Sequence, residues 1–551
     1  MTARLSIALA QTDPKVGDVA GNLARIRSAR GRAAALGADL VVFSELVVSG
    51  YPPEDLVLKP AFRESCRAAV ESLAADTADG GPGMIVGAPW VENGKVHNTG
   101  MLLDGGKIAA LRHKHDLPNY GVFDEKRVFA AGPLPGPIVF RGVRLGLMIC
   151  EDMWFPDSAE CLVESGAEML VVPNGSPFET DKLDERVALA VRRVVETGLP
   201  LIYVNQVGGQ DELVFDGASF VLNADRNLAA QSPAFVEDVS LTRWEKGPKG
   251  WGCVEGPHAK PPEKLGAIYA ALMLGLRDYV SKNRFPGTIL GLSGGIDSAL
   301  TAAIAADALG PDKVRAVMMP SRYTSQESLD DAAACAKLLG IAYDIVSIEP
   351  AVGAFGKMLD PLFAGTNSGI AEENIQSRAR GLTLMALSNK FGHMVVSTGN
   401  KSEMSAGYAT LYGDMCGGFA VLKDVYKTTV FELSRWRNSN WPEGALGPKG
   451  PVMPERVIVK PPTAELRPDQ TDEASLGPYA RLDAILQALV EGEKTVAEIV
   501  AKGYGEEEVR KVWRMLDLAE YKRRQAPPGV KITRRAFGRE RRYPIVNGFR
   551  G

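Results

Sequence analysis

The feature that most constrains the fold of this chain is the stretch over residues 288–300, TILGLSGGIDSAL. Apolar and β-branched residues come first, Ser-Gly-Gly follows, and an alanine-rich run typical of a helix comes last. This order predicts a strand, a tight turn and a helix. The stretch therefore indicates an α/β fold in which the turn lies at the end of a strand.

The turn has the properties of a phosphate-binding loop. Two glycines let backbone N–H groups turn inward, and the helix N-terminus adds its dipole. The loop is not a Walker A motif, because Asp297 stands where a lysine is expected. An aspartate beside phosphates is explained if it binds Mg²⁺. Although a Gly-Gly turn alone can be a simple connection, SGGIDS resembles the signature of the N-type ATP pyrophosphatases, which adenylate a substrate and release pyrophosphate.

Length and composition limit the classes of function. A chain of 551 residues is too long for one core and predicts two large domains or several smaller ones. A net charge of −4 gives no sign of a nucleic-acid partner. The sequence has no apolar run long enough for a membrane span and no signal peptide, so we expect a cytoplasmic protein. The six cysteines are scattered, which predicts free thiols, one of them available as a nucleophile.

Strands alternate with helices over residues 1–245, which predicts a buried sheet covered by helices. Glu45 and Cys150 end two of these strands, and Lys114 follows another segment at a loop entrance. A carboxylate paired with an ammonium group can activate a thiol. In this hypothesis Glu45 takes the thiol proton and later activates water, and Lys114 stabilises the oxyanion. Each residue alone is commonplace, and their shared position at strand ends favours the catalytic interpretation.

The motifs FSELVVSGYPPEDL, RHKHDLPNYGVFDE, GLMICEDMWFP and VPNGSPF follow one another in this half. In this order they resemble the nitrilase, or carbon–nitrogen hydrolase, superfamily. The resemblance implies an αββα sandwich and a Glu-Lys-Cys triad at Glu45, Lys114 and Cys150. It further implies contacts to glutamine at Tyr120, Ser176 and Lys182. It also implies a second carboxylate beside the triad, at Glu125.

Residues 246–262 are rich in Gly, Pro and charge, and we expect them to be a linker. Over residues 263–551 strands again alternate with helices, which predicts a doubly wound parallel sheet with ligands at the carboxyl ends of its strands. SGGIDS and residues 397–403 lie at such ends. We expect Thr398 to contact ATP, Glu403 to join Asp297 on Mg²⁺, and Lys427, in preference to Lys423, to lie over phosphates.

The motifs AEENIQSRARG, STGNKSEMSAGYATLYGD and PPTAELRPDQTDEASLGPY resemble the synthetase domain of the glutamine-dependent NAD synthetases. GMP and asparagine synthetases carry a related loop, but the nitrilase-like half argues against them. The resemblance implies ATP, glutamine and deamido-NAD as substrates and a homo-oligomer. It places deamido-NAD on Asn374, Glu403 and Lys522. It places ATP on Gly291, Leu292, Ser293, Gly294, Gly295, Ile296, Asp297, Ser298 and Thr398.

Some alternatives stay open at this point. The same halves are compatible with a different glutamine-dependent ligase, and a regulatory module without catalysis is a second alternative. Residues 441–462 form either a mobile cover of the site or a long connection. The basic residues between 522 and 542 are expected partly at a dinucleotide diphosphate or a subunit contact and partly on the surface.

Overall fold

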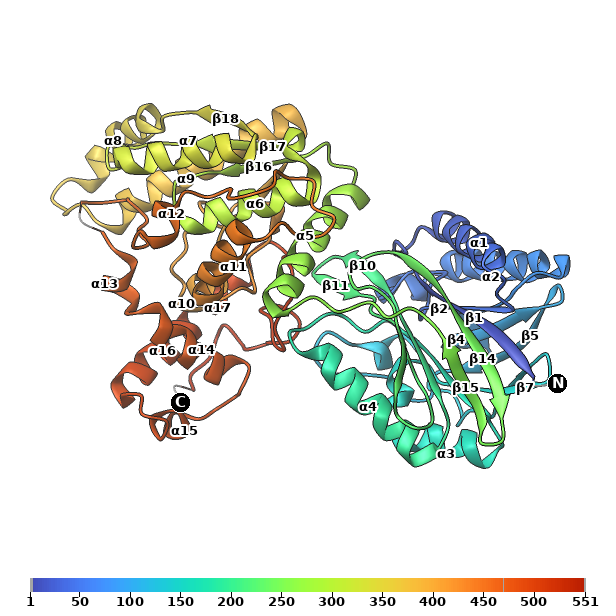
Figure 1. Ribbon diagram of the computed structural model, residues 1–551. Helices are drawn as coiled ribbons and strands as arrows, with labels where there is room; N and C mark the ends of the chain where they lie inside the picture. Colours follow the sequence, from blue (N-terminus) through green and yellow to red (C-terminus); the bar gives the residue numbers. More distant parts are fainter. Residues whose placement is uncertain (1–2, 469, 550–551) are drawn as a thin grey trace. The chain divides into compact units, whose positions relative to one another are not determined.

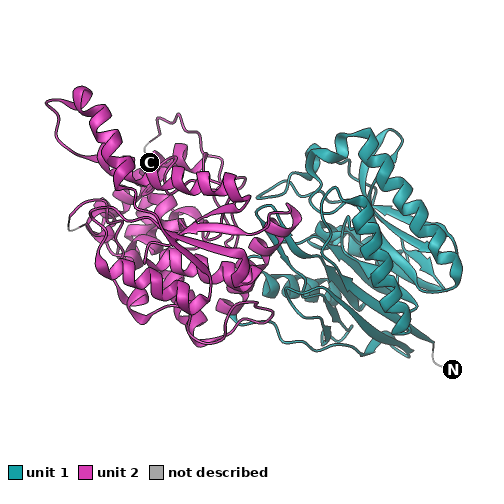
Figure 2. Cartoon of the chain, turned by 90° about the horizontal axis from the view of Figure 1, so that it is seen from above, with its two compact units in different colours: residues 1–263 teal, residues 264–551 magenta. Residues whose placement is uncertain are grey.

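The computed structural model describes residues 3–468 and 470–549 (Figure 1). The chain divides into two compact units, Met1–Glu263 and Lys264–Gly551 (Figure 2). Among the residues that the structure describes, no helix combines the length and hydropathy needed to cross a bilayer.

Unit 1 contains two mixed sheets and a small hairpin. The first sheet has the order β15-β14-β1-β2-β3-β4-β5, the second has the order β13-β12-β9-β8-β7-β6, and β10 pairs with β11. The strands of the first sheet are β1 (Arg4–Gln11), β2 (Leu40–Phe43), β3 (Gly83–Glu92), β4 (Lys95–Asp104), β5 (Lys107–His113), β14 (Asp238–Gly247) and β15 (Gly250–Glu255). The others are β6 (Ile138–Phe140), β7 (Val143–Leu147), β8 (Met169–Asn174), β9 (Leu201–Asn205), β10 (Val207–Gln210), β11 (Leu213–Asp216), β12 (Phe220–Leu222) and β13 (Leu228–Gln231).

The two sheets pack face to face, and helices cover their outer faces. Successive side chains of a strand point to opposite faces, so β1 sends Ile7 to the core between the sheets and Ala8 to the core under the helices. Helices α1 (Val19–Ala35) and α2 (Pro60–Asp76) cover the first sheet, and α3 (Pro156–Glu164) and α4 (Lys182–Thr197) cover the second. The predicted αββα sandwich is confirmed.

The prediction of a linker over residues 246–262 is wrong for its first part. Strands β14 and β15 pair antiparallel up to Gly247 and Gly250, so the Gly-Pro-Lys-Gly sequence is the turn of a hairpin. Trp251 and Cys253 alternate into the core between the sheets. Six residues rich in glycine give too short a period-2 signal to be separated from a linker.

Unit 2 is built on a parallel sheet with the order β18-β17-β16-β19-β20, as predicted. Its strands are β16 (Thr288–Gly291), β17 (Val314–Met318), β18 (Ala342–Ile345), β19 (Met394–Ser397) and β20 (Phe419–Ala420). The helices up to the last strand are α5 (Lys264–Lys282), α6 (Ile296–Leu309), α7 (Gln326–Leu339), α8 (Glu349–Phe363), α9 (Ile370–Phe391) and α10 (Lys401–Ala406). From β16 the chain extends the sheet through β17 and β18, and it then returns to the other side of β16 with β19. The loops after β16 and β19 therefore flank a topological switch point, where ligands bind in open α/β sheets.

After β20 the regular elements of unit 2 are helices, joined by long loops. Its helices are α11 (Lys427–Ser439), α12 (Glu455–Val459), α13 (Asp472–Leu476), α14 (Tyr479–Val490), α15 (Val496–Val500), α16 (Glu506–Leu518) and α17 (Glu520–Arg523). Helices α14 and α16 contribute Leu482, Ile485, Val509 and Val512 to one apolar core, which also contains Met404 of α10. This core therefore anchors the short helix that follows β19.

Candidate active sites

Glu45 and Lys114 form an ion pair that is fully buried in unit 1. Glu45 follows β2, Lys114 follows β5, and Lys114 Nζ donates to Glu45 Oε1 at 2.6 Å. Lys114 Nζ also donates to Glu125 Oε1 at 2.9 Å. Burial disfavours the charged lysine, but Glu125 and Glu45 more than offset this and raise the pKa of Lys114 well above its ordinary value. Lys114 therefore carries a positive charge between two carboxyl groups.

Three further groups, which the sequence did not indicate, fix these carboxyl groups. Asn98 of β4 donates from Nδ2 to Glu45 Oε1 at 2.7 Å, and Tyr51 donates from its hydroxyl to Glu125 Oε1 at 2.8 Å. The backbone N–H of Gly175 donates to Glu45 Oε2 at 3.0 Å. Both oxygens of Glu45 are thus held in place. Asn98 belongs to an ordinary strand sequence, and only the register of β4 against β3 and β5 brings it here.

Cys150 begins a 3₁₀ turn over Cys150–Met153, shortly after β7. It is buried and its φ is 49°, a left-handed backbone conformation that is uncommon outside glycine. Burial and the nearby Glu45 carboxylate raise the pKa of the Cys150 thiol well above its ordinary value, and Lys114 opposes this. The thiol is therefore neutral at neutral pH, and it lies within electrostatic reach of both other residues of the predicted triad.

Asp152 joins the turn of Cys150 to the segment that follows Lys114. Its Oδ1 accepts hydrogen bonds from the backbone N–H groups of His115 at 2.9 Å and Asp116 at 2.8 Å. Its Oδ2 accepts one from Ile149 at 2.9 Å. Burial raises the pKa of Asp152 to about 7, although these backbone donors oppose the shift. Asp152 follows Cys150 by two positions, which was the one signal in the sequence that pointed to it.

The three predicted glutamine contacts occupy different settings. Tyr120 is half-exposed and donates to both carboxylate oxygens of Glu151, the neighbour of Cys150, at 3.0 Å. Ser176 follows β8 and is buried. Lys182 opens α4, and its ammonium group lies 4.8 Å from the centroid of the Trp154 ring and forms an ion pair with Glu185. Each lies beside a segment that also holds a triad residue, but none is itself in the triad's ion-pair network.

In unit 2 a cavity of about 270 Å³ lies at the switch point. Its lining includes every residue predicted to hold ATP, namely Gly291, Leu292, Ser293, Gly294, Gly295, Ile296, Asp297, Ser298 and Thr398. Ser298 of α6 ties the loop together, because its hydroxyl lies 3.1 Å from that of Ser293 and donates to the carbonyl of Gly295 at 2.9 Å. The predicted strand, turn and helix are β16, residues 292–295 and α6.

Asp297, Lys427 and Glu403 meet in this cavity. Lys427 at the start of α11 is hydrogen-bonded to Asp297 Oδ2 and lies 3.5 Å from Glu403 Oε1. Asn400 Nδ2 donates to Asp297 Oδ1 at 2.8 Å. Burial and the repulsion of Asp297 raise the pKa of Glu403 to about 8, despite the attraction of Lys427. One lysine faces two partly buried carboxyl groups, which leaves room for a further positive charge.

The donor set at Asp297 and Glu403 fits Mg²⁺. Among the described residues no group of three or more His, Cys, Asp and Glu side chains has the arrangement of a metal centre. Mg²⁺, however, is usually bound through one or two carboxylates, with water and substrate phosphates as its other ligands. Two hard carboxylate groups beside a phosphate-binding loop therefore meet its requirements.

Asn374 and Lys522 lie outside the residues that line the cavity and converge on residues 407–410. Asn374 Oδ1 accepts a hydrogen bond from the Thr410 hydroxyl at 2.9 Å. Lys522 Nζ donates to the carbonyls of Gly407 and Ala409, each at 2.7 Å. Tyr408, between these two positions, lines the cavity. Two of the three predicted deamido-NAD contacts, Asn374 and Lys522, thus support one wall of the cavity, and the third, Glu403, lines it.

The sequence missed a second group of cavity residues. Arg380, Lys460 and Glu465 all line the cavity. Glu465 accepts from the hydroxyls of Ser325 and Ser328, at 2.7 and 2.8 Å, and Lys460 donates to Ser328 at 2.8 Å. Lys460 belongs to the stretch 441–462, whose role the sequence left open, and the end of that stretch is a wall of the cavity. Arg380 and Glu465 lie in two of the motifs that carry the resemblance but were not singled out there, and Lys460 had no signal beyond the run of glycine and proline.

Several of the basic residues near the C-terminus are engaged within unit 2. Arg523 is buried and donates to the carbonyls of Met404 and Ser405, and Arg541 pairs with Glu520 at 2.9 Å. Lys531 is also buried. These side chains anchor the tail to α10 and α17 and are not a solvent-facing basic patch.

Comparison with known proteins matches the two units to two families. Residues 6–244 match the carbon-nitrogen hydrolase family, and residues 268–526 match the NAD synthase family. The glutamine-dependent NAD(+) synthetase of Rhodobacter capsulatus is 50% identical over 550 residues, which cover 100% of both chains. That of Acinetobacter baylyi is 46% identical and covers 99% of this chain and 98% of the relative.

Solved structures agree with this assignment. The glutamine-dependent NAD+ synthetase of Acinetobacter baumannii, in complex with ADP, is 44% identical and superposes with a TM-score of 0.79 over 99% of each chain. The synthetase of Cytophaga hutchinsonii, at 22% identity and a TM-score of 0.81, covers 100% of this chain and 98% of its own and shares the fold. With full-length relatives at this level of identity, the chain belongs to the glutamine-dependent NAD(+) synthetase family.

Proposed function

We propose that the two units divide one reaction, the ATP-dependent amidation of deamido-NAD to NAD with glutamine as the nitrogen source. Unit 1 releases ammonia from glutamine, and unit 2 activates the nicotinate carboxylate of deamido-NAD by adenylation. Ammonia then displaces AMP. The products are NAD, AMP, pyrophosphate and glutamate.

In unit 1 the nucleophile is Cys150. Its thiol is neutral before substrate binds, so the proton moves to Glu45 as sulfur attacks the side-chain amide of glutamine. Lys114, held as a cation by Glu45 and Glu125, stabilises the oxyanion. Glu45 then donates the proton to the departing ammonia and later activates the water that hydrolyses the acyl-enzyme. The two-sided hydrogen bonding of Glu45 supports this role, because it keeps the carboxylate in place through both steps.

In unit 2 the backbone of residues 291–298 receives the phosphates of ATP at the N-terminus of α6. Asp297 and Glu403 would hold Mg²⁺, which neutralises charge on the phosphates when it is bound. Lys427 adds a fixed positive charge on the same side, and Thr398 contacts ATP. Tyr408 lies on the cavity wall that Asn374 and Lys522 support, and we assign deamido-NAD to that side of the cavity.

Ammonia is mostly protonated in neutral water and is then no nucleophile. The proposed reaction therefore requires that ammonia pass from unit 1 to unit 2 within the protein. We also expect the cytoplasmic location and the homo-oligomer that the sequence predicted.

One observation carries the proposal: the buried pair of Glu45 and Lys114, within electrostatic reach of the buried Cys150, lies in the same chain as a second site where Asp297 of SGGIDS and Glu403 share Lys427. The direct test supplies deamido-NAD, Mg-ATP and glutamine and measures NAD and AMP. Formation of both, in equal amounts, is expected. AMP and pyrophosphate formed only with a different carboxylate would favour another glutamine-dependent ligase.

The division of labour predicts separable defects. Cys150→Ala should abolish NAD formation from glutamine and leave NAD formation from ammonium salts unchanged, because unit 2 is intact. Asp297→Ala should reduce both, because adenylation needs the charge at the phosphates. A folded Cys150→Ala variant that has lost the ammonium-driven reaction too would refute this division.

A further inference from the structure

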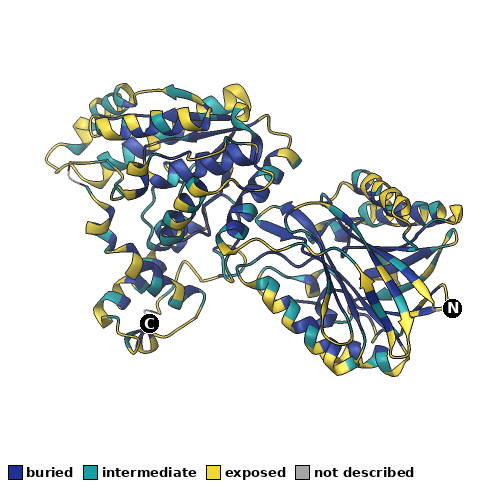
Figure 3. Ribbon diagram, viewed as in Figure 1, coloured by how far each residue is buried: buried dark blue, intermediate teal, exposed yellow. Residues whose placement is uncertain are grey.

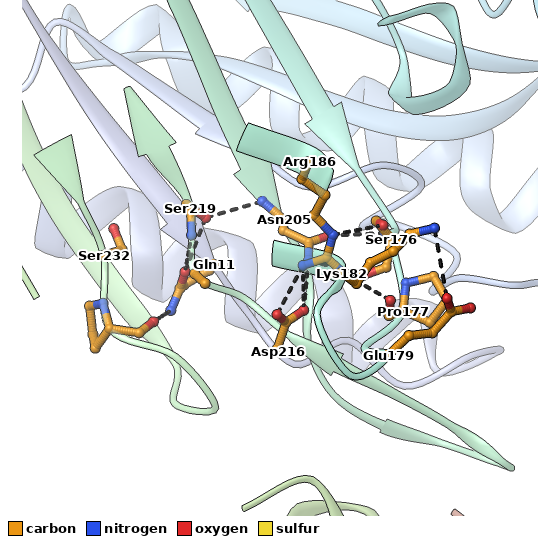
Figure 4. A network of polar contacts seen from close by, with 12 residues as sticks. Gln11, Ser176, Pro177, Glu179, Lys182, Arg186, Asn205, Asp216, Ser219 and Ser232 are labelled. Carbon is orange, nitrogen blue, oxygen red and sulfur yellow. Dashed lines mark hydrogen bonds and ion pairs between the residues drawn. The ribbon is translucent and has the colours of Figure 1, made fainter. Parts of the chain in front are cut away.

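A buried ion pair between Arg186 and Asp216 contacts Ser176, one of the residues predicted to bind glutamine. Arg186 of α4 is 1% exposed, and its Nη1 donates to both carboxylate oxygens of Asp216, at 2.8 and 2.9 Å. Asp216 ends β11, and Asn205, at the end of β9, donates to its Oδ1 at 3.3 Å. Figure 4 shows these side chains converging on Ser176 and Pro177. Burial disfavours the guanidinium charge, but Asp216 more than offsets this and raises the pKa of Arg186.

The remaining donors of Arg186 hold the loop that follows β8. Nε donates to the Ser176 hydroxyl at 3.0 Å, and Nη2 donates to the carbonyls of Ser176 at 2.9 Å and Pro177 at 2.7 Å. Asn205 completes the clamp, because its Oδ1 accepts from Ser176 N at 3.0 Å and its Nδ2 donates to Ser176 O at 3.1 Å. The planar guanidinium thus fixes two successive residues while Asp216 fixes the guanidinium.

The clamped loop reaches the proposed general base directly. Gly175, the residue before Ser176, donates its N–H to Glu45 Oε2. Gly175 is tightly packed, because a Cβ atom there would lie 2.7 Å from the Tyr51 ring and 3.2 Å from Glu45 Oε2. A shift of the loop by a fraction of an ångström therefore alters the hydrogen bond that orients Glu45.

Arg186 also sets the polarity of Ser176. A guanidinium group has donors and no acceptor, so the Ser176 oxygen must accept from it. The one hydroxyl proton of Ser176 is then directed to the buried Tyr203 hydroxyl, with which the Ser176 side chain is hydrogen-bonded.

We infer that Arg186 and Asp216 are positioning residues for glutamine hydrolysis, which hold the loop of residues 175–177 so that the Gly175 N–H stays against Glu45. This inference rests on the proposed function of unit 1 and assigns a role to residues outside its triad. It differs from a purely structural role, in which the pair serves only to neutralise a buried charge.

The test compares Arg186→Lys with the double variant Arg186→Met/Asp216→Leu in the full chain. The lysine retains the charge beside Asp216 but lacks the fork that holds residues 176 and 177. The double variant removes the charges together and leaves none unpaired. For both we expect kcat/KM for glutamate release from glutamine to fall about 10²-fold, as for small misplacements of catalytic groups. The fall should include kcat, since Glu45 is affected. NAD formation from ammonium should be unchanged.

Arg193→Met is the matched control. Arg193 is another buried arginine of α4 and donates to Glu196 on the same helix, so the variant leaves the 174–177 loop untouched. It should retain the wild-type kcat/KM for glutamine.

If the pair serves only to neutralise a buried charge, the double variant, which leaves no charge unpaired, should hydrolyse glutamine at the normal rate. Normal glutamine hydrolysis in a double variant whose ammonium-driven rate is also normal would overturn the inference. The proposed function would still stand, because the wild type hydrolyses glutamine. A wild-type chain that releases no glutamate would overturn both.

Discussion

Lys114 is the residue on which the chemistry of unit 1 depends most. Its charge is stabilised from two sides, by Glu45 at 2.6 Å and by Glu125 at 2.9 Å, in surroundings that exclude water. A single carboxylate would lose much of its basicity in such a pair. With Glu125 present, the lysine is already compensated, and Glu45 stays available to exchange a proton with Cys150.

Asp152 gives a pH-dependent prediction. Its pKa is about 7 in the folded protein against an ordinary value of 3.8, so the folded state binds the proton more tightly than the unfolded chain. The free energy of unfolding should therefore fall as pH rises through this interval and level off above it. Relative to Asp152→Asn, which does not titrate, the wild type should lose on the order of 2–3 kcal/mol between about pH 5 and 7.

Calorimetric unfolding of both proteins across this pH range measures the effect. Asn has one acceptor oxygen instead of two, which shifts the whole curve of the variant downward at every pH. The prediction concerns only the difference in slope. Parallel curves for the wild type and Asp152→Asn would contradict it.

Residues near one another in sequence, or at strand ends, could be predicted, and their partners could not. Glu45, Lys114 and Cys150 could be predicted because α/β sheets collect reactive groups at strand ends. Asn98 could not, because only the pairing of β4 with β3 and β5 brings it to Glu45, and Tyr51 could not, because it reaches Glu125 from a loop 74 residues away in the chain. The role of Arg186 could not be predicted either, because an arginine in an amphipathic helix is ordinarily a surface residue.

At the scale of elements, the loop between β16 and α6 is shaped by its contact with α7. Gly294 has a φ of +81°, and a Cβ atom there would lie 2.3 Å from the backbone oxygen of Ser328 in α7. Gly295 has a φ of −89°, and its Cβ would come no closer than 3.3 Å to the Ser293 hydroxyl. The two glycines of SGGIDS therefore serve different purposes: the first permits close packing, and the second lies open at the helix N-terminus.

This difference predicts unequal effects of the same substitution. Gly294→Ala should destabilise unit 2 by at least about 1–2 kcal/mol, from the left-handed backbone alone, with the clash added. It should also reduce the ammonium-driven rate, because α7 and the loop must separate. Gly295→Ala should change stability by less than about 1 kcal/mol. Thermal unfolding measures both, and equal effects of the two variants would disprove the assignment.

The elements themselves were largely predictable. The apolar strands and the helices between them predicted a helix-covered sheet in the first half and the parallel sheet in the second, and the αββα sandwich followed from the resemblance to the nitrilase superfamily. The strand β15 was not recognised because glycine masks its alternation, although Trp251 and Cys253 are buried. The wall formed by Lys460 and Glu465 was not recognised either, because its contacts with α7 are made across more than a hundred residues.

For the whole molecule, helix α8 is the surface that we expect to take part in the predicted homo-oligomer. None of the α8 residues that the structure describes is buried (Figure 3). Its apolar residues Met358 and Leu362 are 61% and 77% exposed. Large exposed apolar side chains that gather on one element are typical of association surfaces. A second copy of this chain is the partner that the predicted homo-oligomer requires.

We therefore expect Met358→Asp/Leu362→Asp to reduce the mass measured by light scattering to that of a smaller assembly. Charges placed on both partners at an apolar contact are costly to bury. Lys357→Glu, an exposed change on the same helix, is the control and should leave the mass unchanged. A wild-type chain that already has the mass of one chain would rule out the oligomer.

In the proposed reaction Cys150 of unit 1 releases from glutamine the nitrogen that unit 2 fixes into NAD. The most direct measurement gives the enzyme glutamine labelled with ¹⁵N at its side-chain amide, together with unlabelled ammonium, deamido-NAD and Mg-ATP, and determines the isotope in the NAD amide by mass spectrometry. The account predicts ¹⁵N in NAD from the wild type and only unlabelled NAD, still formed, from Cys150→Ala. Labelled NAD from Cys150→Ala, or wild-type NAD whose nitrogen comes from the free ammonium alone, would contradict it.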